Sequence, residues 1–242
     1  MAASSSLSRR LYGTDQPDVE SVETSAGAFR FRVQGPQLRG VMLGDTEVLR
    51  SVGLVIRDEF WGTHQLHQRA CETFADDQDW RQIVDGYVAG IDGVPLLEWW
   101  VDMHIGLRGI SVCARLRALE DFVTCRAGLM LLHPLKGVVN SPVSVTHSDG
   151  SIERGTFPDL IAPAQPFLDI RRLVHSPTPG LTLQWDFSGD VFEMEDQRNW
   201  CDASFKTYNR PLAWPCPYRL GKGEHIEQSM SLSLLDDSGV CA

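Results

Sequence analysis

The chain has 242 residues and a formal net charge of −10, from 22 Lys and Arg against 32 Asp and Glu. Its 43% of hydrophobic and 22% of charged residues are typical of a soluble globular protein and exclude disorder of the whole chain. The sequence contains no run of about 18 apolar residues, so no membrane span is expected. The acidic balance argues against binding to the phosphates of a nucleic acid. We therefore expect neither a nucleic-acid nor a membrane partner.

Cysteine spacing and the N-terminal stretch bear on the cellular compartment. The cysteines are widely scattered and form no C-x-x-C pair, which argues against a zinc ribbon or a thioredoxin motif. The N-terminus lacks the apolar stretch of a signal peptide. We therefore predict a cytoplasmic protein with reduced thiols. No linker divides the chain, so we expect one domain over 1–242, with 1–10 disordered.

The first part of the chain has the pattern of β-strands. Residues 29–33 alternate strictly between apolar and polar side chains, as in a half-buried strand. Two more apolar runs follow between Val41 and Val55. Turn signals then recur every ten to fifteen residues, which is typical of a sandwich or a barrel. Residues 64–82 are polar and poor in β-forming residues, and there we expect either a helix or a long connecting loop.

The stretch from Leu97 to Ile105 separates into two faces, because a strand sends alternate side chains to opposite sides. One face is apolar and predicts a core. The other carries Glu98, Trp100, Asp102 and His104. An indole beside carboxylates suits a sugar, since the ring covers apolar C–H groups and the carboxylates accept hydrogen bonds from hydroxyls. The alternative is a solvated outer face that carries one tryptophan by chance.

A hairpin is predicted around Asp149-Gly150. Residues 143–147 alternate and 152–154 return, and Asp-Gly suits a tight turn with positive φ at both central residues. The proline-rich stretch 158–166 has the composition of a crossing loop.

The densest set of chemically active side chains lies in residues 192–208. If this stretch begins as a strand, Glu193 and Glu195 share one face, about 6.5–7 Å apart along the backbone. Such a pair can divide acid and base roles, or bind a divalent metal together with His133 or His104. The alternative is a structural loop in which these acids pair with Arg198 and Lys206.

The same stretch carries a family resemblance. Residues 192–200 and 202–208 resemble the signature of the N-terminal region of the D-apionate lactonase family. Residues 11–17, 57–63, and 147–150 with 157–161 support that resemblance, which runs from about 11 to 230. Members of this family open the lactone ring of a branched sugar acid and are usually longer, with a barrel-like domain after this region. The region also resembles the supersandwich of sugar mutarotases, in which a concave sheet faces the sugar.

Together these observations predict an all-β fold: an antiparallel β-supersandwich, galactose-mutarotase-like, with one or two short helices. The two polar stripes are expected on neighbouring strands of one concave sheet. The favoured function is hydrolysis of a small sugar or sugar-acid lactone. Two alternatives are a non-catalytic sugar-binding or accessory subunit for a separate catalytic barrel protein, and a mutarotase-like sugar epimerase.

The candidate site follows from that prediction. Glu193 or Glu195 activates water, directly or through a divalent metal, the one cofactor considered. The oxyanion is stabilised by Lys206, Arg198 or His133. We expect Glu193, Glu195 and one of His104, His133 or His147 to converge within about 8 Å, a span that a water or a metal can bridge. The expected substrate-binding residues are Trp100, Asp102, His104, Arg198 and Asn199.

Overall fold

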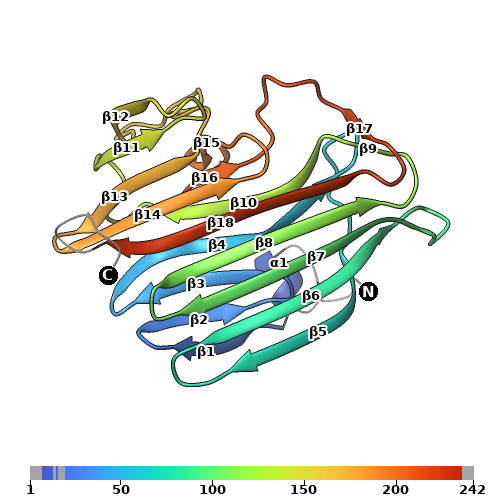
Figure 1. The fold of residues 1–242 in the computed structure, drawn as a ribbon, viewed down its shortest axis with the longest axis horizontal. Helices are drawn as coiled ribbons and strands as arrows, with labels where there is room; N and C mark the ends of the chain where they lie inside the picture. The colour runs from blue at the N-terminus through green and yellow to red at the C-terminus, as the bar shows by residue number, and fades with distance from the viewer. Residues whose placement is uncertain (1–6, 13–14, 16–19, 236–242) are drawn as a thin grey trace, which may run out of the picture.

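The computed structural model describes residues 7–12, 15 and 20–235. Within these residues the protein is a sandwich of antiparallel strands, as Figure 1 shows, which confirms the predicted all-β class. The helical elements described are α1 (Leu7–Tyr12) and the short 3₁₀ helix η1 (Gln197–Trp200). Of the stretch 1–10 that was expected to be disordered, residues 1–6 lie outside the described part, and Leu7–Arg10 belong to α1.

One sheet of the sandwich has seven strands. Their order is β1 (Val22–Ala26), β2 (Phe29–Val33), β3 (Gln37–Leu43), β4 (Thr46–Arg57), β10 (Arg126–Pro134), β16 (Ser204–Tyr208) and β15 (Glu193–Asp196). The predicted strand over 29–33 is therefore confirmed as β2. Its alternate residues are buried, so the pattern in the sequence reflects one face on the core and one toward solvent.

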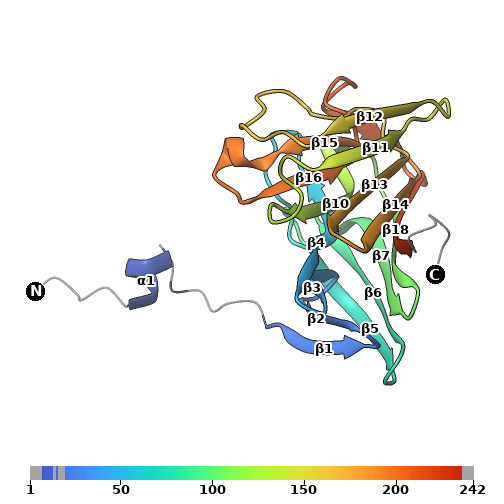
Figure 2. The same ribbon diagram turned by 90° about the vertical axis from the view of Figure 1, so that its left-hand side faces the viewer.

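The other large sheet has nine strands. Their order is β12 (Ile152–Thr156), β11 (Pro142–Thr146), β13 (Arg172–Thr178), β14 (Leu181–Ser188), β18 (His225–Leu235), β8 (Gly109–Ala118), β7 (Pro95–Gly106), β6 (Trp80–Ala89) and β5 (His67–Ala75). A small third sheet pairs β17 (Tyr218–Leu220) with β9 (Phe122–Thr124). Figure 2 shows the two large sheets from the side, facing each other.

Aromatic pairs join the two sheets across the core. Phe31 on β2 contacts Trp80 on β6 edge to face, with ring centroids 5.1 Å apart. At the other end, His133 on β10 contacts Trp185 on β14 in the same way, at 5.0 Å. Such aromatic contacts stabilise the packing beyond the burial of area alone. The core is continuous between these points, and it includes the predicted apolar face of β7, from Leu97 to Ile105.

The expectation of a helix or loop over 64–82 is wrong. This segment forms β5 and the start of β6, paired from His67↔Tyr87 to Ala75↔Trp80. The reason lies in the position of β5 at the edge of the nine-stranded sheet. After His67 every residue of β5 is exposed, so neither face is buried and no alternation marks the strand in the sequence.

The predicted hairpin is present as β11 and β12, with Thr146 paired to Ile152. Its turn differs from the one expected. Gly150 has a φ of 84°, but Asp149 keeps a negative φ and accepts a hydrogen bond from the Ser151 N–H at 2.8 Å. A second bond, from Gly150 N–H to the His147 carbonyl at 3.1 Å, closes a four-residue turn.

Candidate functional site

The two polar stripes lie on different sheets, so the expectation that they are neighbours on one sheet is wrong. β7 pairs with β6 and β8 in the nine-stranded sheet, whereas β15 pairs with β16, and β16 with β10, in the seven-stranded sheet. Phe192 and Met194 point into the shared core, as do the apolar residues of β7. The polar residues of the two stripes therefore face outward on opposite sides of the sandwich.

A group of four charged side chains and one tyrosine covers the outer face of β10, β15 and β16. We call it the charged cluster; it consists of Arg126, Glu193, Glu195, Lys206 and Tyr208. Its centre is the ion pair between Lys206 Nζ and Glu195 Oε2, at 2.5 Å, with the side chains only 12% and 18% exposed. The pair forms because Glu195 and Lys206 are directly opposite each other in the β15–β16 register.

Tyr208 connects the other members of the charged cluster. Its hydroxyl donates to Glu193 Oε1 at 2.5 Å, and the same oxygen accepts the Leu212 N–H at 2.9 Å. The ring of Tyr208 lies 4.0 Å from the Arg126 guanidinium carbon and 4.9 Å from Lys206 Nζ. Both cations therefore contact one aromatic ring, an arrangement that stabilises positive charge away from water.

Burial and pairing act in opposite directions on the acid and base groups of the cluster. Burial raises the pKa of Glu195, but the hydrogen bonds from Lys206 and Trp200 outweigh it, and the net pKa is lowered. Burial also lowers the pKa of Lys206 and of Arg126 against the opposing effect of nearby acids. Glu195 is therefore ionised at neutral pH and available as a base.

Two exposed indoles flank the charged cluster. Trp200 is 71% exposed and donates its Nε1–H to Glu195 Oε1 at 2.8 Å. Trp61 is 43% exposed, and the Arg126 guanidinium lies 5.5 Å from its ring centroid. Flat apolar rings beside fixed charges are suited to a polyhydroxylated ring with one apolar face. The Nε of Arg126 is buried without a hydrogen-bond partner in the described residues.

Arg198 and Asn199 hold the loop beside the cluster. The Arg198 guanidinium donates to Asp196 and to three carbonyl oxygens, those of Pro158, Asp159 and Leu160. The Asn199 side-chain amide donates to the Ala162 carbonyl. These bonds fasten the proline-rich crossing loop to η1. Arg198 and Asn199 therefore have a structural role here.

His133 lies on the core side of the seven-stranded sheet, opposite the charged cluster. It is 1% exposed and its Nε2 is 2.8 Å from Thr207 Oγ1. Burial lowers its pKa to about 3, so it is neutral. His104 lies on the other sheet, and His147 lies in the β11–β12 turn. The structure thus brings Glu193 and Glu195 together on one face without a histidine.

Within residues 7–12, 15 and 20–235, no three or more His, Cys, Asp or Glu residues are arranged to hold a metal ion. Nor does any helix in this part of the chain have the length and apolar character needed to cross a membrane.

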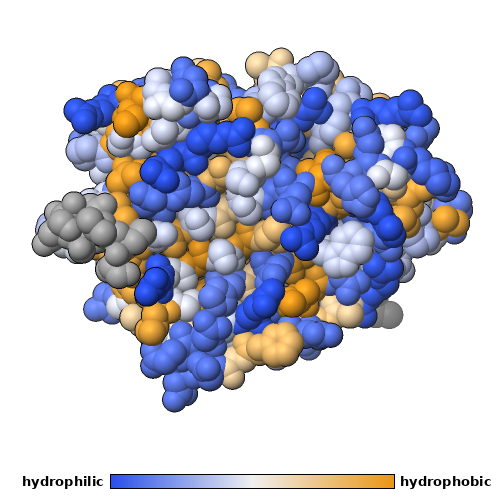
Figure 3. Space-filling view, in the orientation of Figure 1, coloured by the Kyte–Doolittle hydropathy of each residue, from blue (hydrophilic) through white to orange (hydrophobic). Residues whose placement is uncertain are grey.

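The other polar stripe borders a series of hollows on the outer face of the nine-stranded sheet. Trp100 is half-buried and lines a cavity of about 440 Å³ with Asp102, Arg81, Arg115 and other residues. Asp102 is fixed by Arg81 through two bonds of 2.9 and 2.6 Å, and the bond from Arg81 lowers the pKa of this carboxyl. Glu98 is buried between Arg69 and Arg117. Figure 3 shows hydrophilic and apolar areas interspersed on the face of the molecule that it presents.

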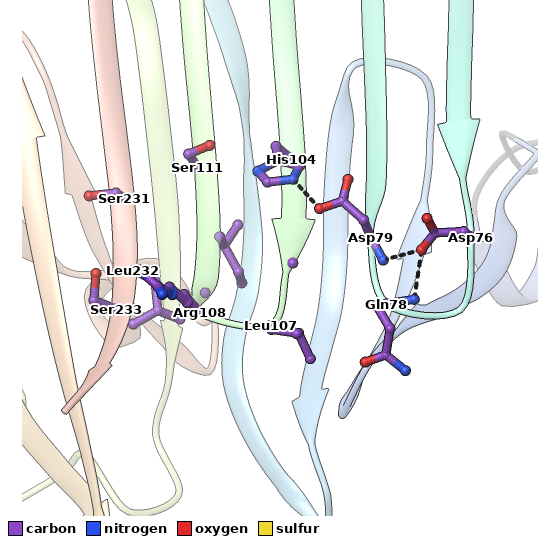
Figure 4. Close-up of a pocket in the computed structure, with 13 residues that line it drawn as sticks. Asp76, Gln78, Asp79, His104, Leu107, Arg108, Ser111, Ser231, Leu232 and Ser233 are labelled. Carbon is purple, nitrogen blue, oxygen red and sulfur yellow. Dashed lines mark hydrogen bonds and ion pairs between the residues drawn. The ribbon is translucent and has the colours of Figure 1, made fainter. Parts of the chain in front are cut away.

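An adjoining cavity of about 460 Å³ extends this series toward the end of β7. Figure 4 shows His104 at its edge, bonded through Nε2 to Asp79 Oδ2 at 2.7 Å. His104 and Asp102 both also line a hollow of about 310 Å³ that lies between the two larger cavities. The predicted sugar stripe is therefore a hollowed surface, but its charged groups are largely paired with one another.

Sequence reasoning missed three contributors to the charged cluster and its rim: Tyr208, Arg126 and Trp61. Tyr208 has a local signal, because it lies two residues after Lys206 and so shares its face on a strand. Arg126 and Trp61 have none, since they reach the cluster only through the pairing of β10 with β16 and β4.

Solved structures with the same architecture define the class of fold. A putative mutarotase from Salmonella typhimurium has a TM-score of 0.56 at 11% identity, covering 88% of this chain and 90% of that one. Galactose 1-epimerase from Lactobacillus acidophilus has a TM-score of 0.53 at 8% identity, with 92% and 96% covered. A β-arabinopyranosidase has 0.56 at 7%, with 86% of this chain but 39% of its own covered. The fold is thus an antiparallel sandwich of the galactose-mutarotase type.

The sequence comparison is more specific. Residues 9–237 match the family described as D-apionate lactonase, N-terminal domain, and the chain belongs to that family. It is also 37% identical over 231 residues to a D-apionate lactonase from Brucella anthropi. That alignment covers 93% of this chain but 37% of the relative, so the chain spans well under half of the relative's length.

Proposed function

We propose that this chain acts in the hydrolysis of a small sugar lactone, and that the charged cluster is where the lactone binds and reacts. The observation that carries the proposal is the Glu195–Lys206 pair beside Arg126, on the same face as two exposed indoles. The family to which the chain belongs and the name of its relative support this substrate class.

Lactone opening needs an activated water, a stabilised oxyanion and a proton for the leaving ring oxygen. Glu195 is the better base of the two glutamates, since it reaches solvent while Glu193 is 2% exposed and held by Tyr208. Glu195 would take the proton of the attacking water. The ammonium of Lys206 and the guanidinium of Arg126 would stabilise the charge that forms on the carbonyl oxygen. The proton on Glu195 would then pass to the alkoxide that leaves.

Hydrolysis of a panel of sugar lactones tests this assignment. Glu195→Gln keeps the shape and removes the base, and should lower the rate about 10²–10⁴-fold with the fold intact. Glu47→Gln is the matched control, since Glu47 forms a partly exposed pair with Arg50 on the same sheet. Equal rates in both variants would exclude Glu195 as the base.

A second candidate is a non-catalytic sugar-binding module that works beside a separate catalytic subunit. The half-buried Trp100 in its cavity favours it. Trp100→Ala should then weaken sugar binding by about 1–3 kcal/mol in a calorimetric titration. Activity that appears only when the remaining part of a family member is added would also favour the module.

Free aldoses belong in the same panel, because a mutarotase-like epimerase needs an acid and a base but no hydrolytic water. Polarimetry on aldoses separates that activity from lactone opening. The cytoplasmic location predicted from the sequence stays a prediction.

A further inference from the structure

Two cysteine thiols that lie 91 positions apart in the sequence meet at the edge of the small third sheet. Tyr218 on β17 is paired with Thr124 on β9. Cys125 directly follows Thr124, and Cys216 precedes Tyr218 by two residues, so the antiparallel register brings these cysteines to the same end of the pair. The two thiols lie close enough that Cys216, after burial, contributes to raising the pKa of Cys125.

The two thiols differ in their access to solvent. Cys216 is exposed, whereas Cys125 is 6% exposed and its Sγ donates to the Glu59 carbonyl at 3.4 Å. Both are free in the structure. A solvent-borne oxidant therefore reaches Cys216 first, and Cys125 is held where it can attack the sulfur of Cys216.

We propose that Cys125 and Cys216 are a disulfide-forming pair, and that their oxidation fastens the 209–217 segment to the start of β10. The oxidant is a small-molecule disulfide such as glutathione disulfide. The Cys216 thiolate attacks one of its sulfurs, giving a mixed disulfide and releasing one glutathione thiolate. Cys125 then loses its proton and attacks the Cys216 sulfur, which releases the second glutathione. The two cysteines lose two electrons and two protons, and the glutathione disulfide gains them.

The bond would affect the charged cluster from outside it. The segment between Tyr208 and Cys216 supplies the Leu212 N–H that binds Glu193, and Arg126 directly follows Cys125. Oxidation would thus fix the distance between the segment that binds Glu193 and the start of β10, where Arg126 lies. The inference does not depend on the proposed lactone chemistry, because its readouts are a covalent bond and a melting temperature.

Burial raises the pKa of the Cys125 thiol to about 11, which makes the second step slow at neutral pH. Its thiolate fraction rises about tenfold per pH unit below that value, and ring closure should follow between pH 7 and pH 9.

The experiment incubates the full chain with glutathione disulfide at pH 7, 8 and 9, followed by non-reducing tryptic mapping. We expect peptides 118–126 and 207–219 to become joined, with loss of the mixed disulfide on Cys216. The oxidised protein should melt about 5 °C or more above the reduced one, because the bond closes a long loop. Addition of a dithiol should reverse both changes.

Single variants complete the test. Cys216→Ser and Cys125→Ser should each abolish the link and the rise in melting temperature, and Cys125→Ser should retain glutathione on Cys216. Cys201→Ser, at another exposed cysteine, should change neither. Persistence of the mixed disulfide on Cys216 at pH 9 without closure would overturn the proposal, as would a link to a different cysteine.

Discussion

Lys206 Nζ lies 2.5 Å from Glu195 Oε2, and neither side chain is more than one-fifth exposed. Such a pair is costly to break from one side, because the remaining charge stays largely away from water. It is also the feature on which the proposed chemistry depends, since the hydrogen bond from Lys206 helps to lower the pKa of Glu195 against the effect of burial.

Replacement of Lys206 by Met should destabilise the protein by about 1–3 kcal/mol at pH 7, between the values typical of exposed and of buried pairs. Burial, which raises the pKa of Glu195, would then no longer be opposed by Lys206. The native pair stabilises the fold fully above 4.5, the ordinary pKa of a glutamate in the unfolded chain. This stabilisation is lost as the pH falls through the lowered pKa of Glu195 in the folded protein. The loss in Lys206→Met should therefore shrink below pH 4.5. Urea unfolding at pH 7 and pH 4 measures it, and an equal loss at both would contradict the prediction.

The buried histidines should make the protein sensitive to mild acid. Burial lowers the pKa of His133 to about 3 and of His175 to about 4, from an ordinary value of 6.5. Below pH 6.5 the unfolded chain takes up protons that the folded chain excludes. Each histidine should thus lower the stability by about 1.4 kcal/mol per pH unit between pH 6.5 and 4. In His133→Gln the combined slope of the two buried histidines should fall by about half. His225→Gln, at an exposed histidine, should leave it unchanged. Unfolding curves across this range provide the measurement.

Gly128 on β10 should tolerate no side chain. A Cβ there would lie 2.1 Å from Asn209 Oδ1 and 2.2 Å from Gln228 Oε1. Gln228 cannot move freely, because the same oxygen accepts the Leu129 N–H at 2.8 Å. Gly128→Ala should cost about 1–3 kcal/mol or more in the free energy of unfolding. Gly221→Ala, where the nearest atom lies at 3.5 Å on a side chain, is the control. Equal melting temperatures for the two variants would refute this account.

Arg198→Lys should loosen the proline-rich crossing loop. Arginine reaches Asp196 and three carbonyl oxygens at once, and a single ammonium cannot reproduce that geometry. We expect a loss of about 2–4 kcal/mol and faster amide exchange within 158–166. Arg115→Lys, in an exposed pair with Glu227, should cost at most about 1 kcal/mol. Unchanged exchange in the loop would mean that other contacts hold it.

The sequence predicted some of the strands that have one buried face, β2 and β7 among them. The alternation in β2 and β7 follows directly from the core on one side of each strand. It did not predict β5, whose two faces are both in solvent. The arrangement of the strands was harder still, because sheet membership depends on pairing between segments far apart in the chain. For this reason Glu195 and Lys206 were predicted as neighbours, but Arg126 was not.

The exposed position of β5 has a consequence for the behaviour of the protein in concentrated solution. In the described residues no strand pairs with its outer side, which leaves a row of backbone donors and acceptors open to a second molecule. Arg69 and Glu72 place charges on this strand, and residues of this kind hinder edge-to-edge pairing of sheets. We expect that replacing both by neutral residues would let this edge strand pair with that of a second molecule and start fibrous assembly, without any change in the core.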